Sequence, residues 1–99
     1  MSDVLLTLYC AAADGELIAD HIGEAQQTMV HLRNEQVFGR DFADASPSER
    51  VMGQLRRCAL EVIVPHDAIA PLVASINALG RAAPVRWHTV PILSAGRLS

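Results

Sequence analysis

The chain has 99 residues, a formal net charge of −3 and a hydrophobic fraction of 51%. This length suits one domain with its own core, and so much apolar sequence excludes intrinsic disorder. The acidic balance argues against nucleic acid as a partner, and because all eight basic residues are arginine, chemistry that depends on a lysine is excluded.

The first half of the chain predicts a strand, a helix and a second strand. Val4–Tyr9 is a short apolar run typical of a buried strand, and Asp14-Gly15 interrupts the pattern soon after it. Over residues 16–27 apolar side chains recur with a 3.6-residue period, which predicts an amphipathic helix that Asp14 is able to cap. Residues 29–37 alternate between apolar and polar side chains, as a strand at a sheet edge does.

The second half begins with a long segment that has no regular period. Residues 37–53 are rich in Gly, Asp, Ser and Pro and exceed the usual loop length, which predicts a long functional loop. Residues 55–64 restore a strand pattern, and a helical apolar period starts at about residue 69 and ends at Gly80. Residues 85–93 predict a last strand, and Pro91 within it favours a sheet edge.

The predicted order of elements, strand-helix-strand-strand-helix-strand, is that of an α+β ferredoxin-like fold. Its antiparallel four-stranded sheet carries both helices on one face. In this topology the first and third strands are central neighbours. We expect them to pair so that one apolar stripe faces the helices, with Val4 opposite Val64, Leu6 opposite Val62, Leu8 opposite Leu60 and Cys10 opposite Cys58.

The opposite face of this sheet is too apolar for plain solvent exposure and too polar for a core. It carries Leu5, Thr7, Tyr9, Ala59, Glu61 and Ile63. Such a mixture is typical of a subunit interface, and the high apolar content of so small a chain agrees with that interpretation. We therefore expect a homo-oligomer.

Two segments resemble the PII signalling proteins. The run Leu60–Asp67, with the sequence LEVIVPHD, is similar to their third strand and helix entry, and Phe38-Gly39-Arg40 is similar to the start of their long partner-binding loop. Both lie on the expected elements in the expected order. The short link after the second helix and the closing segment 95–98 are most similar to a small PII-like family of uncharacterised function, often found beside heavy-metal efflux pumps.

The resemblance implies a homotrimer whose sheets face inward, with ligand clefts between the subunits. PII proteins bind small effectors there and control transporters or enzymes through the loop. On this chain the resemblance places Gly39 and Arg40 at a cleft, Glu61 on its wall and Phe38 at the start of the partner-binding loop. The implied partner is a membrane transporter, such as a metal-efflux system.

Other aromatic residues extend this predicted site. Trp87 is the sole tryptophan, and with the adjacent His88 on the last strand it is a candidate to line the effector cleft, although Trp87 also suits a core or interface position. Phe38 and Phe42 are expected to dock on a partner, because two exposed phenylalanines in a loop are otherwise unfavourable.

The sequence departs from PII proteins at their phosphate-binding segment. Those proteins hold nucleotide phosphates with a Gly- and Lys-rich stretch after the second helix, where this chain has Gly-Arg-Ala-Ala-Pro at residues 80–84 and no lysine anywhere. This argues against ATP binding of the familiar PII kind and leaves the identity of the effector open.

Metal binding is the alternative function. Cys10 and Cys58 form no CxxC motif, but they are expected to meet across the central strand pair, and copper or a divalent ion such as zinc accepts sulfur ligands. Ordinary buried thiols are the simpler explanation. His21, on the apolar stripe of the first helix, is interpreted as a core-edge histidine. A metal site would make the chain similar to the CutA group of metal-tolerance proteins, which shares this fold and trimeric state.

No residue pattern supports catalysis, since neither a Ser-His-Asp arrangement nor a carboxylate pair follows from the spacing. The first apolar run lacks a basic region before it and is too short for a signal peptide or a membrane span. We therefore expect a cytoplasmic, non-enzymatic sensor or regulatory adaptor, in which a bound effector changes the conformation of the loop.

Overall fold

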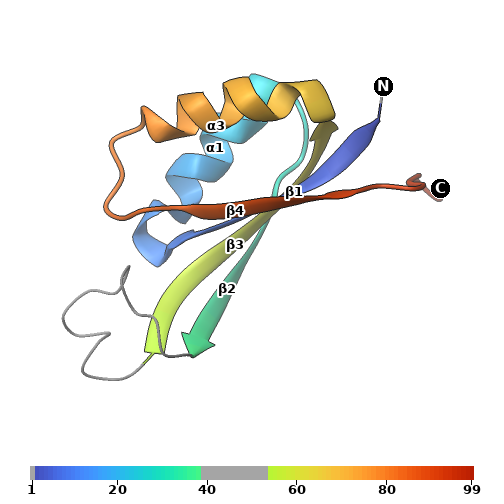
Figure 1. Cartoon of the computed structure of the whole chain (residues 1–99). Helices are drawn as coiled ribbons and strands as arrows, with labels where there is room; N and C mark the ends of the chain where they lie inside the picture. Colours follow the sequence, from blue (N-terminus) through green and yellow to red (C-terminus); the bar gives the residue numbers. More distant parts are fainter. Residues whose placement is uncertain (1, 39–53) are drawn as a thin grey trace.

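The computed structural model describes residues 2–38 and 54–99, and its elements follow the predicted order (Figure 1). Four strands form one antiparallel sheet in the order β2-β3-β1-β4. The fold is therefore the predicted α+β ferredoxin-like arrangement, with β1 and β3 central and β2 and β4 at the edges. The elements are β1 (Asp3–Ala11), α1 (Gly15–Gln26), β2 (His31–Phe38), β3 (Gln54–Pro65), α3 (Ile69–Asn77) and β4 (Arg86–Pro91), with 3₁₀ turns at Ala12–Asp14 and His66–Ala68.

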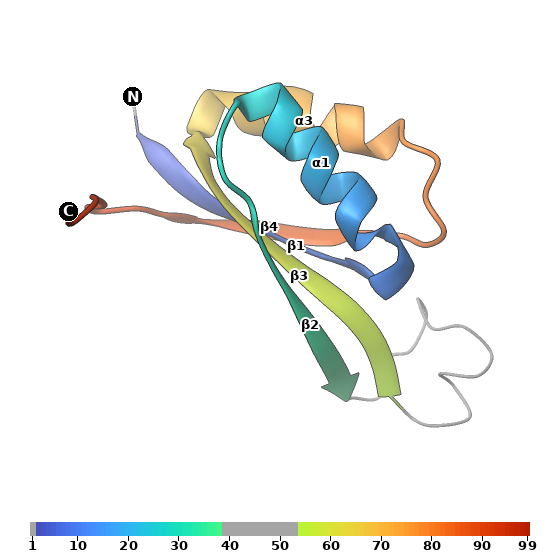
Figure 2. The same ribbon diagram turned by 180° about the vertical axis from the view of Figure 1, so that it is seen from behind.

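Both helices cover the same face of the sheet and leave the other face open (Figures 1 and 2). The end of β2 and the start of β3 project beyond the helix layer, so this hairpin forms an arm (Figure 1). The predicted loop with Gly39, Arg40 and Phe42 lies outside the described residues. No helix in the described ranges is long and apolar enough to cross a membrane.

The register of β1 with β3 is the one predicted. Its four helix-facing pairs join Val4 to Val64, Leu6 to Val62, Leu8 to Leu60 and Cys10 to Cys58, and every one of these side chains is buried. Each large aliphatic side chain buried here contributes roughly 1.5–3 kcal/mol relative to exposure. This stripe is the floor of the hydrophobic core.

The helices form because their apolar residues recur on one side. Ile18 and Ile22 of α1 point into the core, and Ile69, Leu72 and Ile76 do so from α3. α3 ends at Asn77, before Gly80, and the intervening residues continue in a last tight turn in which Leu79 N donates to Ile76 O at 3.0 Å.

A polar contact joins the two helices where they leave the core. His21 Nε2 lies 2.7 Å from Ser75 Oγ, and the Ser75 hydroxyl itself donates to Leu72 O at 2.8 Å. Since the Ser75 proton is committed to Leu72, the imidazole must be the donor to Ser75 Oγ. The interpretation of His21 as a core-edge histidine is confirmed.

The start of α1 packs against β3 so closely that only glycine fits at residue 15. A Cβ atom on Gly15 would lie 2.7 Å from Cys58 Sγ and 3.2 Å from Leu32 Cδ1. The backbone conformation of Gly15 is ordinary for a helix (φ −57°), so the requirement is steric. Gly15 thus sets how near α1 lies to the sheet.

We predict that Gly15→Ala lowers the free energy of unfolding by about 1–3 kcal/mol through this overlap, measured by urea denaturation. Gly23→Ala is the matched control, because its Cβ would meet only Thr28 O at 3.7 Å and alanine favours the helix. In a Gly15→Ala, Cys58→Ala double variant the missing sulfur relieves the overlap, so the two effects must be less than additive; simple additivity would contradict this explanation.

Candidate functional site

The open face of the sheet carries two of the predicted effector residues. Glu61 on β3 and His88 on β4 both lie opposite Thr7 of β1, and His31 on β2 lies opposite Glu61. These four residues form one row across the sheet, with Glu61 and His88 separated by the central strand. The structure therefore places both residues on the face predicted to meet other subunits.

Charged side chains occupy the β2–β3 half of this face. Arg33 Nη1 donates to Glu61 Oε1 at 2.7 Å, and Arg33 Nε donates to Glu35 Oε2 at 3.1 Å. All three side chains retain contact with solvent, so water screens both ion pairs and they add little to stability. Arg33 nevertheless binds one oxygen of Glu61, Oε1. A ligand that donates to Glu61 would therefore use mainly the other carboxylate oxygen.

The β1–β4 half of the open face is apolar and aromatic. Leu5 lies opposite both Ile63 and Val90, and Ile63 and Val90 remain 43% and 42% exposed. In the same half, the rings of Tyr9 and His88 stack with centroids 5.8 Å apart. Thr7 and Ala59, at the middle of the face, are buried within the single chain.

Trp87 and His88 lie on opposite faces of the sheet, because successive side chains of a strand alternate. Trp87 is opposite Leu8, whose side chain faces the helices, whereas His88 is opposite Thr7 on the open face. A cleft on one face can therefore contain only one of these two predicted effector residues. The remaining predicted loop residue within the structure, Phe38, is 69% exposed at the end of β2.

The two cysteines lie opposite each other as predicted, and burial disfavours the thiolate form of both. Both are buried and free, and Cys58 Sγ donates to Asn34 Oδ1 at 3.3 Å. Burial, reinforced by the neighbouring Cys58 and Asp14, raises the pKa of Cys10 from its ordinary 9.0 to about 11, and burial also raises the pKa of Cys58. Within the described ranges, no three His, Cys, Asp or Glu side chains cluster as metal ligands.

Asp14 performs a role that the sequence did not indicate. Its carboxylate does not cap α1; it accepts hydrogen bonds from Ala82 N at 2.9 and 3.1 Å and from Ala83 N at 3.2 Å. The carboxylate is buried and fastens the loop between α3 and β4 to the start of α1. The backbone N–H groups of Ala82 and Ala83 are thus occupied by the protein's own anion.

Comparison with known proteins agrees with this architecture. A family model described as "Protein of unknown function (DUF3240)" matches residues 1–99. The chain belongs to this family. The crystal structure at 2.40 Å resolution of a DUF3240 family protein from Shewanella baltica OS155 has the same fold, with a TM-score of 0.78 and 23% sequence identity over 100% of this chain and 99% of that chain. No curated protein matches the sequence.

We predict that Asp14→Asn lowers the free energy of unfolding by about 2–3 kcal/mol, because it removes the charge that three N–H···O bonds share and turns an NH₂ group toward an N–H donor. Chemical denaturation measures the loss. Asp20→Asn, on the exposed side of α1, is the control and should leave stability nearly unchanged. Equal effects of the two substitutions would show that the loop does not depend on Asp14.

We predict that the Cys10 thiol makes the fold less stable in alkali. Its pKa is raised from 9.0 to about 11 on folding, so the unfolded chain loses this proton first. The contribution of this thiol to the free energy of unfolding is fully present below pH 9 and is lost as the pH rises to 11. The total loss is at most about 3 kcal/mol. Urea midpoints measured across this range should fall more steeply for the natural chain than for Cys10→Ala; parallel curves would refute the assignment.

Proposed function

We propose that this protein is a PII-like regulatory adaptor that assembles as a homotrimer through the open face of its sheet. The observation that supports this proposal is the apolar row of Leu5, Ile63 and Val90, the last two exposed, on a sheet face that neither α1 nor α3 covers. Apolar side chains beside a rim of paired charges are the usual composition of a subunit interface. Burying the row in an interface would stabilise the assembly by about 25 cal/mol for each Å² of apolar surface removed from water.

The effector is expected in the clefts between subunits. Glu61 and His88 on the open face, together with Gly39 and Arg40 at the start of the loop, are the residues proposed to line a cleft. Trp87 belongs to the other face and is not part of it. Because Asp14 already occupies the amides of Ala82 and Ala83, a nucleotide phosphate has no free backbone donors at these two residues, which favours a different effector.

The β2–β3 arm is the proposed partner-binding element. It projects beyond the helix layer (Figure 1), and Phe38 at its end is largely exposed. An aromatic side chain held at the tip of a rigid strand pair is well suited to insert into a partner. We propose that an effector in the cleft changes the loop that follows Phe38 and so switches capture of a membrane transporter, such as a metal-efflux system.

A CutA-like metal-binding function is the second candidate, favoured by the two facing thiols of Cys10 and Cys58. Two sulfurs that face each other on neighbouring strands suit a copper or zinc ion. The raised pKa values of both thiols oppose it, since a metal must displace their protons. A single calorimetric comparison separates the candidates. Zinc or copper that binds the natural chain but not Cys10→Ser, Cys58→Ser would favour the metal function.

The proposed trimer is tested by placing a charge on the open face. We expect the natural chain to sediment as a trimer and Ile63→Arg to sediment as a monomer, because the interface would bury an unpaired cation. Leu17→Arg is the matched control, since Leu17 is also 43% exposed but lies on α1; it should remain trimeric. A natural chain that is monomeric at micromolar concentration would overturn the proposal.

A further inference from the structure

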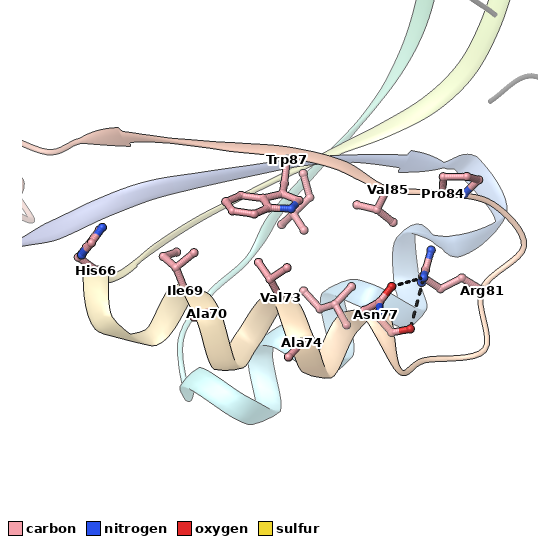
Figure 3. A pocket seen from close by; sticks show the side chains of 12 residues that line it. His66, Ile69, Ala70, Val73, Ala74, Asn77, Arg81, Pro84, Val85 and Trp87 are labelled. Carbon is pink, nitrogen blue, oxygen red and sulfur yellow. Dashed lines mark hydrogen bonds between the residues drawn. The ribbon is translucent and has the colours of Figure 1, made fainter. Parts of the chain in front are cut away.

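A groove of about 670 Å³ lies on the helix side of the sheet, between α3 and β4 (Figure 3). Its volume falls within the range of small-molecule sites. Most of its lining is apolar, and small residues leave its α3 wall open at Ala70 and Ala74. The apolar side chains around it are Leu8, Ile69, Val73, Ile76, Val85 and Trp87.

Trp87 is the principal apolar surface of the groove. It projects from β4 toward α3, above Ile69 and Val73 (Figure 3), and remains 46% exposed. Because β4 is an edge strand, no further strand of the described residues lies beside it. An indole of which nearly half is exposed in an apolar groove offers surface to a second flat or aliphatic body.

Arg81 places a cation at one end of the groove (Figure 3). Its guanidinium donates to Ala83 O at 2.9 Å, Asn77 Oδ1 at 3.1 Å and Asn77 O at 3.4 Å. These acceptors are all uncharged. An arginine has five N–H groups, and its Nε–H is buried without an acceptor among the described residues. Among the described residues Nη1 donates once, to Ala83 O, so its second N–H is the donor left for an anion, while neutral groups hold the charge in place.

The surroundings of Arg81 favour an anion with one charge over a phosphate. The chain has no lysine, and the nearby amides of Ala82 and Ala83 already bind the Asp14 carboxylate. A second, doubly charged group would thus meet one cation and one buried anion. A carboxylate matches a single guanidinium in both charge and planar geometry.

We propose that the α3–β4 groove binds a small amphipathic carboxylic acid, whose apolar body packs on Trp87 and whose carboxylate pairs with Arg81. The site lies within one chain, on the face opposite Glu61 and His88. It is therefore independent of the proposed trimer and of the effector clefts. Ligand binding there would also brace the Asp14-bound loop against α3.

The experiment uses hydrocinnamate as the probe and hydrocinnamamide as its uncharged counterpart. Trp87 is the sole tryptophan, so its fluorescence reports directly on the groove, and equilibrium dialysis gives an independent affinity. We expect saturable binding of hydrocinnamate with a shift in Trp87 emission, and binding of the amide weaker by about tenfold or more, since a charge-assisted pair is lost.

Two variants test the two halves of the site. Arg81→Gln should abolish the preference for the acid, whereas Arg97→Gln, in the exposed C-terminal segment, should preserve it. Ala74→Leu fills the groove from an exposed helix position, leaves Arg81 in place and should block both probes. If Arg81→Gln fails to fold, Ala74→Leu still tests whether the probes bind in the groove.

Three results would overturn the proposal. These are no binding of hydrocinnamate, equal binding of acid and amide, and binding that Ala74→Leu leaves intact. Ile63→Arg separates this inference from the proposed function, because a monomeric variant should bind hydrocinnamate as the natural chain does. Loss of binding in that variant would show that the site requires neighbouring subunits and would refute its placement within one chain.

Discussion

The pairing of β1 with β3 is the constraint on which the rest of the structure depends. It opposes four apolar pairs on the helix side, from Val4 and Val64 to Cys10 and Cys58. A register shift of one residue would turn one of the two strands over, bringing either Thr7 or Glu61 into the core, so the alternation of the sequence excludes it. The helices then pack on a fixed floor, with Gly15 setting the distance at one end and the His21–Ser75 contact joining them.

The same alternation divides the molecule into two surfaces with different chemistry. On the open face, ion pairs around Arg33 lie beside an exposed apolar row, a combination suited to another copy of the chain. On the helix side, Trp87 and Arg81 border a groove of small-molecule size. We propose that one face serves assembly and the other a ligand; neighbouring residues of β4, His88 and Trp87, lie on the two faces.

The individual strands and helices were predictable from the sequence because the signals for each are local. The strand and helix periods, and the edge position that Pro91 indicates, each depend on a few adjacent residues, and the register followed from matching apolar positions on two strands. The alternation rule also places the adjacent Trp87 and His88 on opposite faces of the sheet. The partners of Asp14 could not be inferred, since they lie at Ala82 and Ala83, 68 and 69 residues away, and an Asp before a helix suggests a cap. The groove likewise depends on the path of α3 beside β4.

The central place of the N-terminal strand has a consequence for synthesis. Both neighbours of β1 come from later in the chain, at Gln54–Pro65 and Arg86–Pro91, and β2 is bonded to β3 alone among the strands. A nascent polypeptide on the ribosome therefore exposes its most hydrophobic strand with no partner until most of the chain has emerged. Such non-local topology slows folding, and the unpaired segment is a natural binding site for a chaperone that protects it from aggregation.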